Sequence, residues 1–122
     1  MHASTIRKSL ALTLAVAAAM TAQASAAACR SIRFERGASS AQVRGTAPAE
    51  GFDCLRFGAG NGQDVQVSVR SARDQVAFTI DGVVDDRDSF RFRSSKKTYE
   101  LRVHQTMKAV APVPYELSLA IR

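Results

Sequence analysis

Two near-copies of one segment decide the fold class, Tyr99-Glu100-Leu101-Arg102-Val103-His104-Gln105-Thr106 and Tyr115-Glu116-Leu117-Ser118-Leu119-Ala120-Ile121. In each copy apolar residues alternate with polar ones, which is the pattern of a β-strand with one face on a core and the other in solvent. The connection between the two copies is long enough for a loop and too short for a crossover helix. We therefore expect them to pair as antiparallel neighbours with an exposed loop at their tip.

Short alternating segments recur before these two strands. They cover residues 30–36, 40–45, 52–57, 65–69, 76–80 and 90–92. Turn-forming residues separate them, at Gly37, 47–51, 58–62 and Asp81-Gly82. After Ala28, no apolar stripe with helical periodicity extends over three turns. Roughly eight short, evenly spaced strands predict a single all-β domain, an antiparallel β-sandwich or a small barrel.

The segment after Asp81-Gly82 has two interpretations. An Asp-Gly pair between apolar runs is typical of a tight hairpin turn. The residues that follow carry Asp85, Asp86 and Asp88, which favours a longer acidic loop over residues 83–89. We expect the loop.

The first 26 residues have the pattern of a secretory signal peptide. Arg7 and Lys8 precede a run of small apolar residues from Leu10 to Met20, and Ala24-Ser25-Ala26 is a small-x-small cleavage site. The apolar run is too short to span a bilayer. We expect cleavage after Ala26, which leaves a periplasmic β-sandwich domain of residues 27–122 without a membrane span.

The mature chain would carry a mild positive charge. The sequence has 17 Lys and Arg against 11 Asp and Glu, and without Arg7 and Lys8 the net charge is +4. This excess suits contact with anionic envelope material but is far below the basic footprint of a nucleic-acid-binding protein. We expect no nucleic-acid partner.

Cys29 and Cys54 are the only cysteines of the sequence. In an exported protein they are expected to form a disulfide, and closing a loop of this length stabilises a fold by about 3 kcal/mol. The alternative is that Ala26-Ala27-Ala28-Cys29 is a bacterial lipobox, which would acylate Cys29 and anchor the protein to the outer membrane. That motif lacks its usual leucine, and acylation would leave Cys54 unpaired.

Catalytic and metal-binding patterns are weak. His104 is the only histidine after His2, and its strand register places it outward beside Arg102 and Thr106. There is no Gly-x-Ser-x-Gly elbow and no zinc-ligand spacing. We expect a non-enzyme without a cofactor or metal. Calcium at the carboxylates of residues 81–88 is the alternative, although their spacing does not match a known calcium loop.

Exposed turns favour a binding function instead. Residues 94–98 form a small cationic turn with Lys96 and Lys97, and residues 106–114 form a loop with Met107, Lys108 and two prolines. Prolines restrict the free loop and so lower the cost of ordering it on binding. Phe52 opens the strand that contains Cys54.

Several of these segments together resemble the periplasmic inhibitors of goose-type lysozyme. They are residues 34–45, the Gly51-Phe52-Asp53 strand, the 58–65 turn, Tyr99 to Thr106 and Tyr115 to Ile121. Modules appended to secreted peptidases share the Gly-Gln turn. The resemblance covers nearly the whole mature chain, and it implies an antiparallel β-sandwich that blocks a lysozyme.

The resemblance also implies where a lysozyme would be bound. The family's Ser-Gly-x-Tyr turn, which enters the enzyme's active site, corresponds to Lys96-Lys97-Thr98-Tyr99 here. In the family, arginines follow the Gln-Thr pair; here Met107 and Ala111 occupy those positions, and Lys108 is the candidate substitute. Phe52 replaces the tyrosine of the family's Gly-Tyr-Asp strand. The expected partner-binding residues are Lys96, Lys97, Tyr99, Met107, Lys108 and Phe52. The alternative function is a non-inhibitory module that binds peptidoglycan, an anionic cell-wall glycan, or another exported protein.

Overall fold

Nine strands and one short 3-10 turn make up the part of the chain that the computed structural model describes, residues 28–107 and 111–122. The elements are β1 (Arg30–Ser31), β2 (Ser40–Ala47), β3 (Asp53–Gly58), β4 (Asp64–Ser71), η1 (Ala72–Asp74), β5 (Val76–Ile80), β6 (Val84–Arg87), β7 (Ser89–Arg93), β8 (Thr98–Gln105) and β9 (Val113–Ile121). The predicted signal peptide, residues 1–26, lies outside the described residues.

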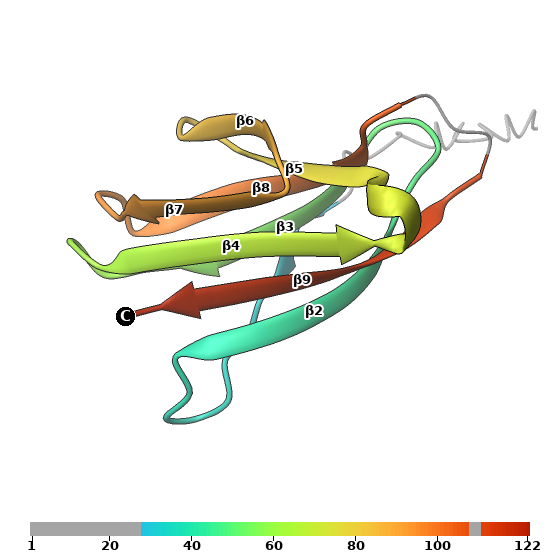
Figure 1. The fold of residues 1–122 in the computed structure, drawn as a ribbon. Coiled ribbons are helices and arrows are strands. Elements are labelled where there is room, and N and C mark those ends of the chain that lie inside the picture. Colours follow the sequence, from blue (N-terminus) through green and yellow to red (C-terminus); the bar gives the residue numbers. More distant parts are fainter. Residues whose placement is uncertain (1–27, 108–110) are drawn as a thin grey trace, which may run out of the picture.

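The strands form two stacked sheets (Figure 1). Sheet A has the order β1-β3-β8-β5-β6, and sheet B has the order β2-β9-β4-β7. All pairs are antiparallel except β1 with β3. The predicted all-β sandwich is therefore confirmed. No helix among the described residues has the length and apolar character needed to cross a bilayer.

The core lies between the two sheets and follows the alternation of the sequence. On β8 the buried side chains are Tyr99, Leu101 and Val103, and on β9 they are Tyr115, Leu117 and Leu119. Phe57 and Phe78 are the largest side chains that are completely enclosed. Burying a side chain of this size stabilises the fold by about 1.5–3 kcal/mol, so these inward rows hold the layers together.

The two Tyr-Glu-Leu strands do not pair with each other, and that prediction was wrong. β8 pairs with β3 and β5 in sheet A, whereas β9 pairs with β2 and β4 in sheet B. The connection between them passes from one layer to the other. Period-two alternation specifies which face of a strand is buried, but it does not specify the neighbouring strand.

Two further expectations from the sequence were also wrong. Residues 84–87 are the edge strand β6 and not part of an acidic loop, because Gly82 adopts a positive φ of 76° and closes a hairpin. At the other edge of sheet A, only Arg30–Ser31 of the expected 30–36 strand pairs with β3. Charged side chains on β6 discourage pairing with a further strand, as is usual for exposed sheet edges.

A polar link joins the two layers beside β1. Tyr115 of β9 donates its hydroxyl hydrogen to Asp53 of β3 at 2.5 Å, and Arg30 of β1 donates to the same carboxylate at 2.7 Å. Gly45 of β2 lies directly against this link, since an added Cβ would clash with the Tyr115 phenol. The tyrosine at the start of β9 is thus an inter-sheet contact as well as a core residue.

Candidate functional site

The turn between β7 and β8, residues 94–97, holds Lys96 and Lys97 on a fixed backbone; we call it the lysine turn. The Tyr99 hydroxyl accepts hydrogen bonds from the backbone N–H groups of Ser95, at 2.8 Å, and Lys96, at 3.0 Å. The Lys97 carbonyl accepts one from the N–H of Ala59, at 2.9 Å. Both lysine residues are exposed. The turn therefore presents two cations without relying on a partner for its shape.

Ser94 anchors the lysine turn to the neighbouring β3–β4 turn. Its side chain is buried, accepts a hydrogen bond from the Gln63 N–H at 2.9 Å and donates one to the Gly60 carbonyl. Its backbone N–H donates to the Gln63 carbonyl at 2.8 Å. The Gly-Gln turn recognised in the sequence thus has a structural role, because it supports the turn beside it.

Tyr99 lies beneath the lysine turn and not on its surface. Its ring stacks on Phe57 with centroids 5.3 Å apart and meets Phe92 edge-on at 5.2 Å. Burial raises the pKa of its hydroxyl, but the two N–H donors and the nearby Lys96 charge outweigh burial, and the net pKa lies below the ordinary value. In this position Tyr99 shapes the turn from below.

The charges of the lysine turn are not neutralised locally. No carboxylate in the described ranges lies within ion-pair distance of Lys96 or Lys97. The Lys96 ammonium lies over Gly82 of the β5–β6 turn, where an added Cβ would come within 2.9 Å of it. An anionic group from another molecule would therefore find two available cations at this end of the sandwich.

The other predicted contact residues lie at the opposite end of β8. Phe52 and Met107 are exposed, with 45% and 79% of their surface accessible. Because the eight residues of β8 rise about 3.3 Å each, its two ends are separated by roughly 25 Å, with Lys97 before the strand and Met107 after it. Lys108 lies outside the described residues. The structure thus divides the predicted residues between two ends and does not gather them into one patch.

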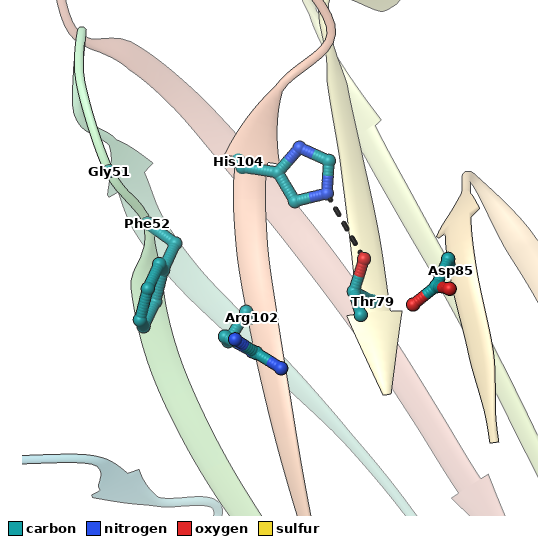
Figure 2. Close-up of a pocket in the computed structure, with 6 residues that line it drawn as sticks. All are labelled: Gly51, Phe52, Thr79, Asp85, Arg102 and His104. Carbon is teal, nitrogen blue, oxygen red and sulfur yellow. Dashed lines mark hydrogen bonds between the residues drawn. The ribbon is translucent and has the colours of Figure 1, made fainter. Parts of the chain in front are cut away.

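A depression near this second end was not predicted from the sequence. It has a volume of about 370 Å³ and is lined by Gly51, Phe52, Thr79, Asp85, Arg102 and His104 (Figure 2). The Arg102 guanidinium lies 5.3 Å from the Phe52 ring centroid and pairs with Asp81 at 2.7 Å. The available signal was the outward register of Arg102 and His104 on one strand. It could not indicate that Asp85 and Asp86 of β6 would lie beside His104.

The depression does not have the geometry of a catalytic relay. Nε2 of His104 lies 3.3 Å from the Thr79 hydroxyl and 3.0 Å from the Asp86 carboxylate, while Nδ1 faces the Gln105 carbonyl. A Ser-His-Asp relay instead needs the acid on one ring nitrogen and the nucleophile on the other. The outward placement of His104 agrees with the sequence, and Asp86 of β6 contacts its ring. Its neighbours tie β5, β6 and β8 together.

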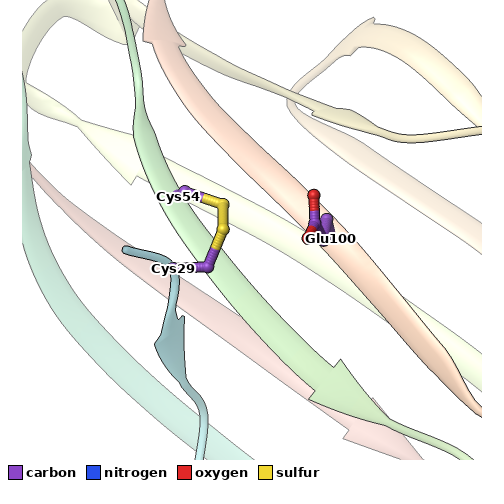
Figure 3. Close-up of side chains that lie close together, drawn as sticks. All are labelled: Cys29, Cys54 and Glu100. Carbon is purple, nitrogen blue, oxygen red and sulfur yellow. A yellow bond between two sulfur atoms is a disulfide. The ribbon is translucent and has the colours of Figure 1, made fainter. Parts of the chain in front are cut away.

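The two cysteines form the expected disulfide, with Glu100 beside it (Figure 3). The bond joins the segment before β1 to β3 and occupies the sulfur that lipidation of Cys29 would need. Joined sulfurs are not thiolate ligands, and the Glu100 carboxylate already pairs with Arg56 at 2.8 Å. The cluster therefore braces the edge of sheet A.

Two of the carboxylates considered for calcium are engaged in separate ion pairs. Asp81 pairs with Arg102 across the sheet, and Asp86 pairs with His104. In the described part of the chain these aspartates form no group close enough to share an ion. Their arrangement is that of an edge hairpin held by individual ion pairs.

The fold matches solved structures, although no family model and no curated protein matches the sequence. A periplasmic inhibitor of g-type (goose-type) lysozyme from Aeromonas hydrophila has a TM-score of 0.61 and 21% identity over 77% of this chain and 96% of its own. A mutant of such an inhibitor from Escherichia coli has a TM-score of 0.60 and 25% identity over 75% of this chain and 96% of its own.

The same fold also occurs in a different setting. A pre-peptidase C-terminal domain of a Bacillus anthracis collagenase has a TM-score of 0.55 and 13% identity, and covers 75% of this chain and 95% of its own. The resemblance to periplasmic lysozyme inhibitors that the sequence indicated is thus confirmed in three dimensions, and what it shows is the architecture. Activity has to be argued from the surface residues of this chain.

Proposed function

We propose that this protein, which has the architecture of the periplasmic inhibitors of g-type lysozyme, is an exported, non-catalytic inhibitor of a lysozyme. The proposal rests on the shape and charge of the lysine turn. Internal hydrogen bonds fix its backbone, and its two cations pair with no carboxylate of residues 28–107 or 111–122. A turn that is ordered before binding loses little conformational entropy when it enters a cleft.

The chemistry of the turn suits a glycosidase cleft. Enzymes that hydrolyse glycosidic bonds carry acidic side chains at the scissile bond, and an ammonium group placed there forms ion pairs in a partly dry site. Lys96 and Lys97 would supply that group, while Tyr99 holds the backbone beneath them. Lysine lacks the bidentate grip of arginine, so we expect each ion pair to be less specific in its geometry. Because a partly buried pair is screened little, salt should act mainly on the rate of association of the two proteins.

The experiment uses mature protein recovered from the periplasm, whose chain should begin at Ala27 and carry no acyl group. Hydrolysis of cell walls by goose-type, chicken-type and invertebrate-type lysozymes is measured as the protein is added up to equimolar amounts. We expect inhibition of one type near equimolar ratio. Full activity of all three enzymes at excess protein would reject the proposal.

A variant of the lysine turn tests whether the two lysines determine which lysozyme is inhibited. Lys96→Ser with Lys97→Gly restores the small residues that the inhibitor family carries at this turn. If the native protein inhibits a lysozyme through its lysines, this variant should lose that inhibition. Gain of inhibition toward the goose-type enzyme alone would show that the native turn opposes binding, which contradicts the role we give to the two lysines.

A further inference from the structure

The outer face of sheet B has an ordered arrangement of charge. The strand register places Arg44, Glu116 and Arg70 in one row across β2, β9 and β4. A second row crosses all four strands and consists of Ser40, Ala120, Gln66 and Arg91. Beyond this row, Asp64 of β4 lies beside Arg93 of β7. Between these two rows lies a row of polar side chains, which the register aligns as Gln42, Ser118, Ser68 and Ser89.

The cations of this face exceed its carboxylates. Arg44 and Arg70 share the single carboxylate of Glu116, at 3.5 Å and 2.6 Å, and their side chains are 88% and 77% exposed. The two guanidinium groups lower the Glu116 pKa; the Arg70 hydrogen bond is the largest cause. Arg91 meets only the neutral Gln66 amide, at 3.4 Å. Guanidinium donors remain available on both sides of the face.

Sheet A is different, because each cation on the outer face of β3 and β8 meets its own carboxylate. Arg56 pairs with Glu100 and Arg102 pairs with Asp81, both within 2.8 Å. Of the two sheets, only sheet B has a positive excess: its strands carry four arginines against two carboxylates, whereas the strands of sheet A carry four arginines against four carboxylates.

We propose that the outer face of sheet B binds a carboxylate-bearing glycan. The two arginine rows are four residues apart along β9 and β4, or about 13 Å, and guanidinium groups bind carboxylates with paired hydrogen bonds. Hydroxyl and amide groups fill the space between the rows and form a shallow depression of about 160 Å³ around Ser68, Ser118 and Gln66. These groups can donate hydrogen bonds to sugar hydroxyls and accept them in return.

The side chains of this face fit a glycan better than other polyanions. All aromatic residues of sheet B in the described ranges, Phe90, Phe92 and Tyr115, belong to the inward rows. Single-stranded nucleic acid is normally held by stacking on exposed aromatic rings, and a membrane surface by inserted apolar side chains. The outward-facing side chains of sheet B, within the part of the chain that the structure describes, offer neither.

The test measures retention of the mature protein on immobilised alginate, a polyuronate, and on neutral dextran, at about 0.15 M salt. The face variant is Arg44→Gln with Arg91→Gln, one residue from each row. The matched control is Arg36→Gln with Arg73→Gln, which removes the same charge from exposed positions outside both sheets. A third variant, Ser118→Glu, adds a carboxylate between the rows.

We expect alginate retention by the native protein, none on dextran, and roughly a three- to tenfold loss of affinity in the face variant. The control should stay within about twofold of the native protein. Ser118→Glu should weaken binding more than the control, although it changes the net charge less. Thermal unfolding confirms that every variant is folded.

Three results would overturn the assignment. They are equal losses in the face and control variants, no retention of the native protein, and tighter binding to duplex DNA or to phosphatidylglycerol vesicles than to alginate. The lysozyme assay is independent of this surface, because the lysine turn lies at the end of the sandwich and remains unchanged in all three variants.

Discussion

Gly45 marks the closest approach between the edge of sheet B and the polar link of Tyr115, Asp53 and Arg30. An added Cβ would clash with the Tyr115 phenol and lie 2.8 Å from the Asp53 carboxylate. Neither neighbour can move freely, because the tyrosine hydroxyl and the carboxylate are bonded to each other. The glycine is therefore required by space and not by its backbone conformation.

Gly45→Ala should destabilise the protein by about 1–3 kcal/mol, which is the usual cost of overpacking a closed site. Gly58→Ala is the matched control, since its Cβ would lie 3.4 Å from the nearest atom, the Lys97 carbonyl oxygen. Urea unfolding measures both variants. Equal stability of the two variants would show that the link yields to the extra methyl group.

The two tyrosines should ionise at different pH values. Burial and the Asp53 carboxylate raise the pKa of Tyr115 far above the ordinary value of about 10, whereas the pKa of Tyr99 is lowered, its backbone donors outweighing burial. With two tyrosines and no tryptophan in the chain, phenolate absorbance reports both groups separately. In the native protein Tyr99 should therefore titrate first.

The raised pKa of Tyr115 also lowers the stability of the fold at alkaline pH. Above pH 10 the unfolded chain ionises Tyr115 while the folded chain does not, so this group's contribution to stability is lost as the pH rises further. Tyr115→Phe should accordingly flatten the loss of stability above pH 10 and leave the first absorbance step intact. A single step containing both tyrosines, in folded protein, would contradict the assignment.

At the scale of elements, the disulfide compensates for a weak strand. β1 contributes only two residues and one parallel pairing, so few hydrogen bonds hold the amino-terminal segment. Cys29 and Cys54 close a loop with a sequence separation of 25 and fix this segment to β3. The disulfide thereby holds Arg30 close to Asp53, and the Arg30–Asp53 ion pair is part of the inter-sheet link with Tyr115.

Replacing both cysteines with alanine should cost about 2–4 kcal/mol of stability, mainly because the unfolded chain gains freedom. Urea unfolding of the variant and of the native protein, with and without a thiol reductant, measures the loss. The reductant should lower the free energy of unfolding of the native protein only, toward the value of the variant. Identical unfolding curves in all four samples would show that the bond contributes nothing.

Strand content was predictable from this sequence, while strand neighbours were not. Alternation located the buried rows of β4, β5, β8 and β9 because it reflects burial directly. β6 was missed because three of its four residues are charged, and a hairpin turn rather than apolar content creates it. The pairing of β8 with β9 was wrongly inferred from adjacency in the chain, since a short connection can equally cross between layers.

The candidate site was predictable to a similar degree. The exposed cationic turn was visible in residues 94–98, and the burial of Tyr99 follows from its register with Leu101 and Val103. The separation of Lys97 from Met107 by the length of β8 could also have been read from the strand itself. The arginine rows of sheet B could not, because they depend on which strands are neighbours.

At the scale of the whole molecule, the domain presents two cationic surfaces that face different directions. The lysine turn occupies one end of the sandwich, and the arginine rows cover the outer face of sheet B. We propose the first for a lysozyme and the second for a glycan, so that an inhibitor could be held on the cell wall that the enzyme attacks. Phe52 and Met107 are exposed at the opposite end of the sandwich from the lysine turn.

The most direct measurement compares inhibition by variants at the two ends. Lys96→Ala with Lys97→Ala is set against Phe52→Ala with Met107→Ala, and the inhibition constant toward the susceptible lysozyme is determined for each at two salt concentrations. The account predicts at least a tenfold loss, about 1.4 kcal/mol, for the lysine pair and little change for the other pair. A loss confined to the Phe52 and Met107 pair would contradict it.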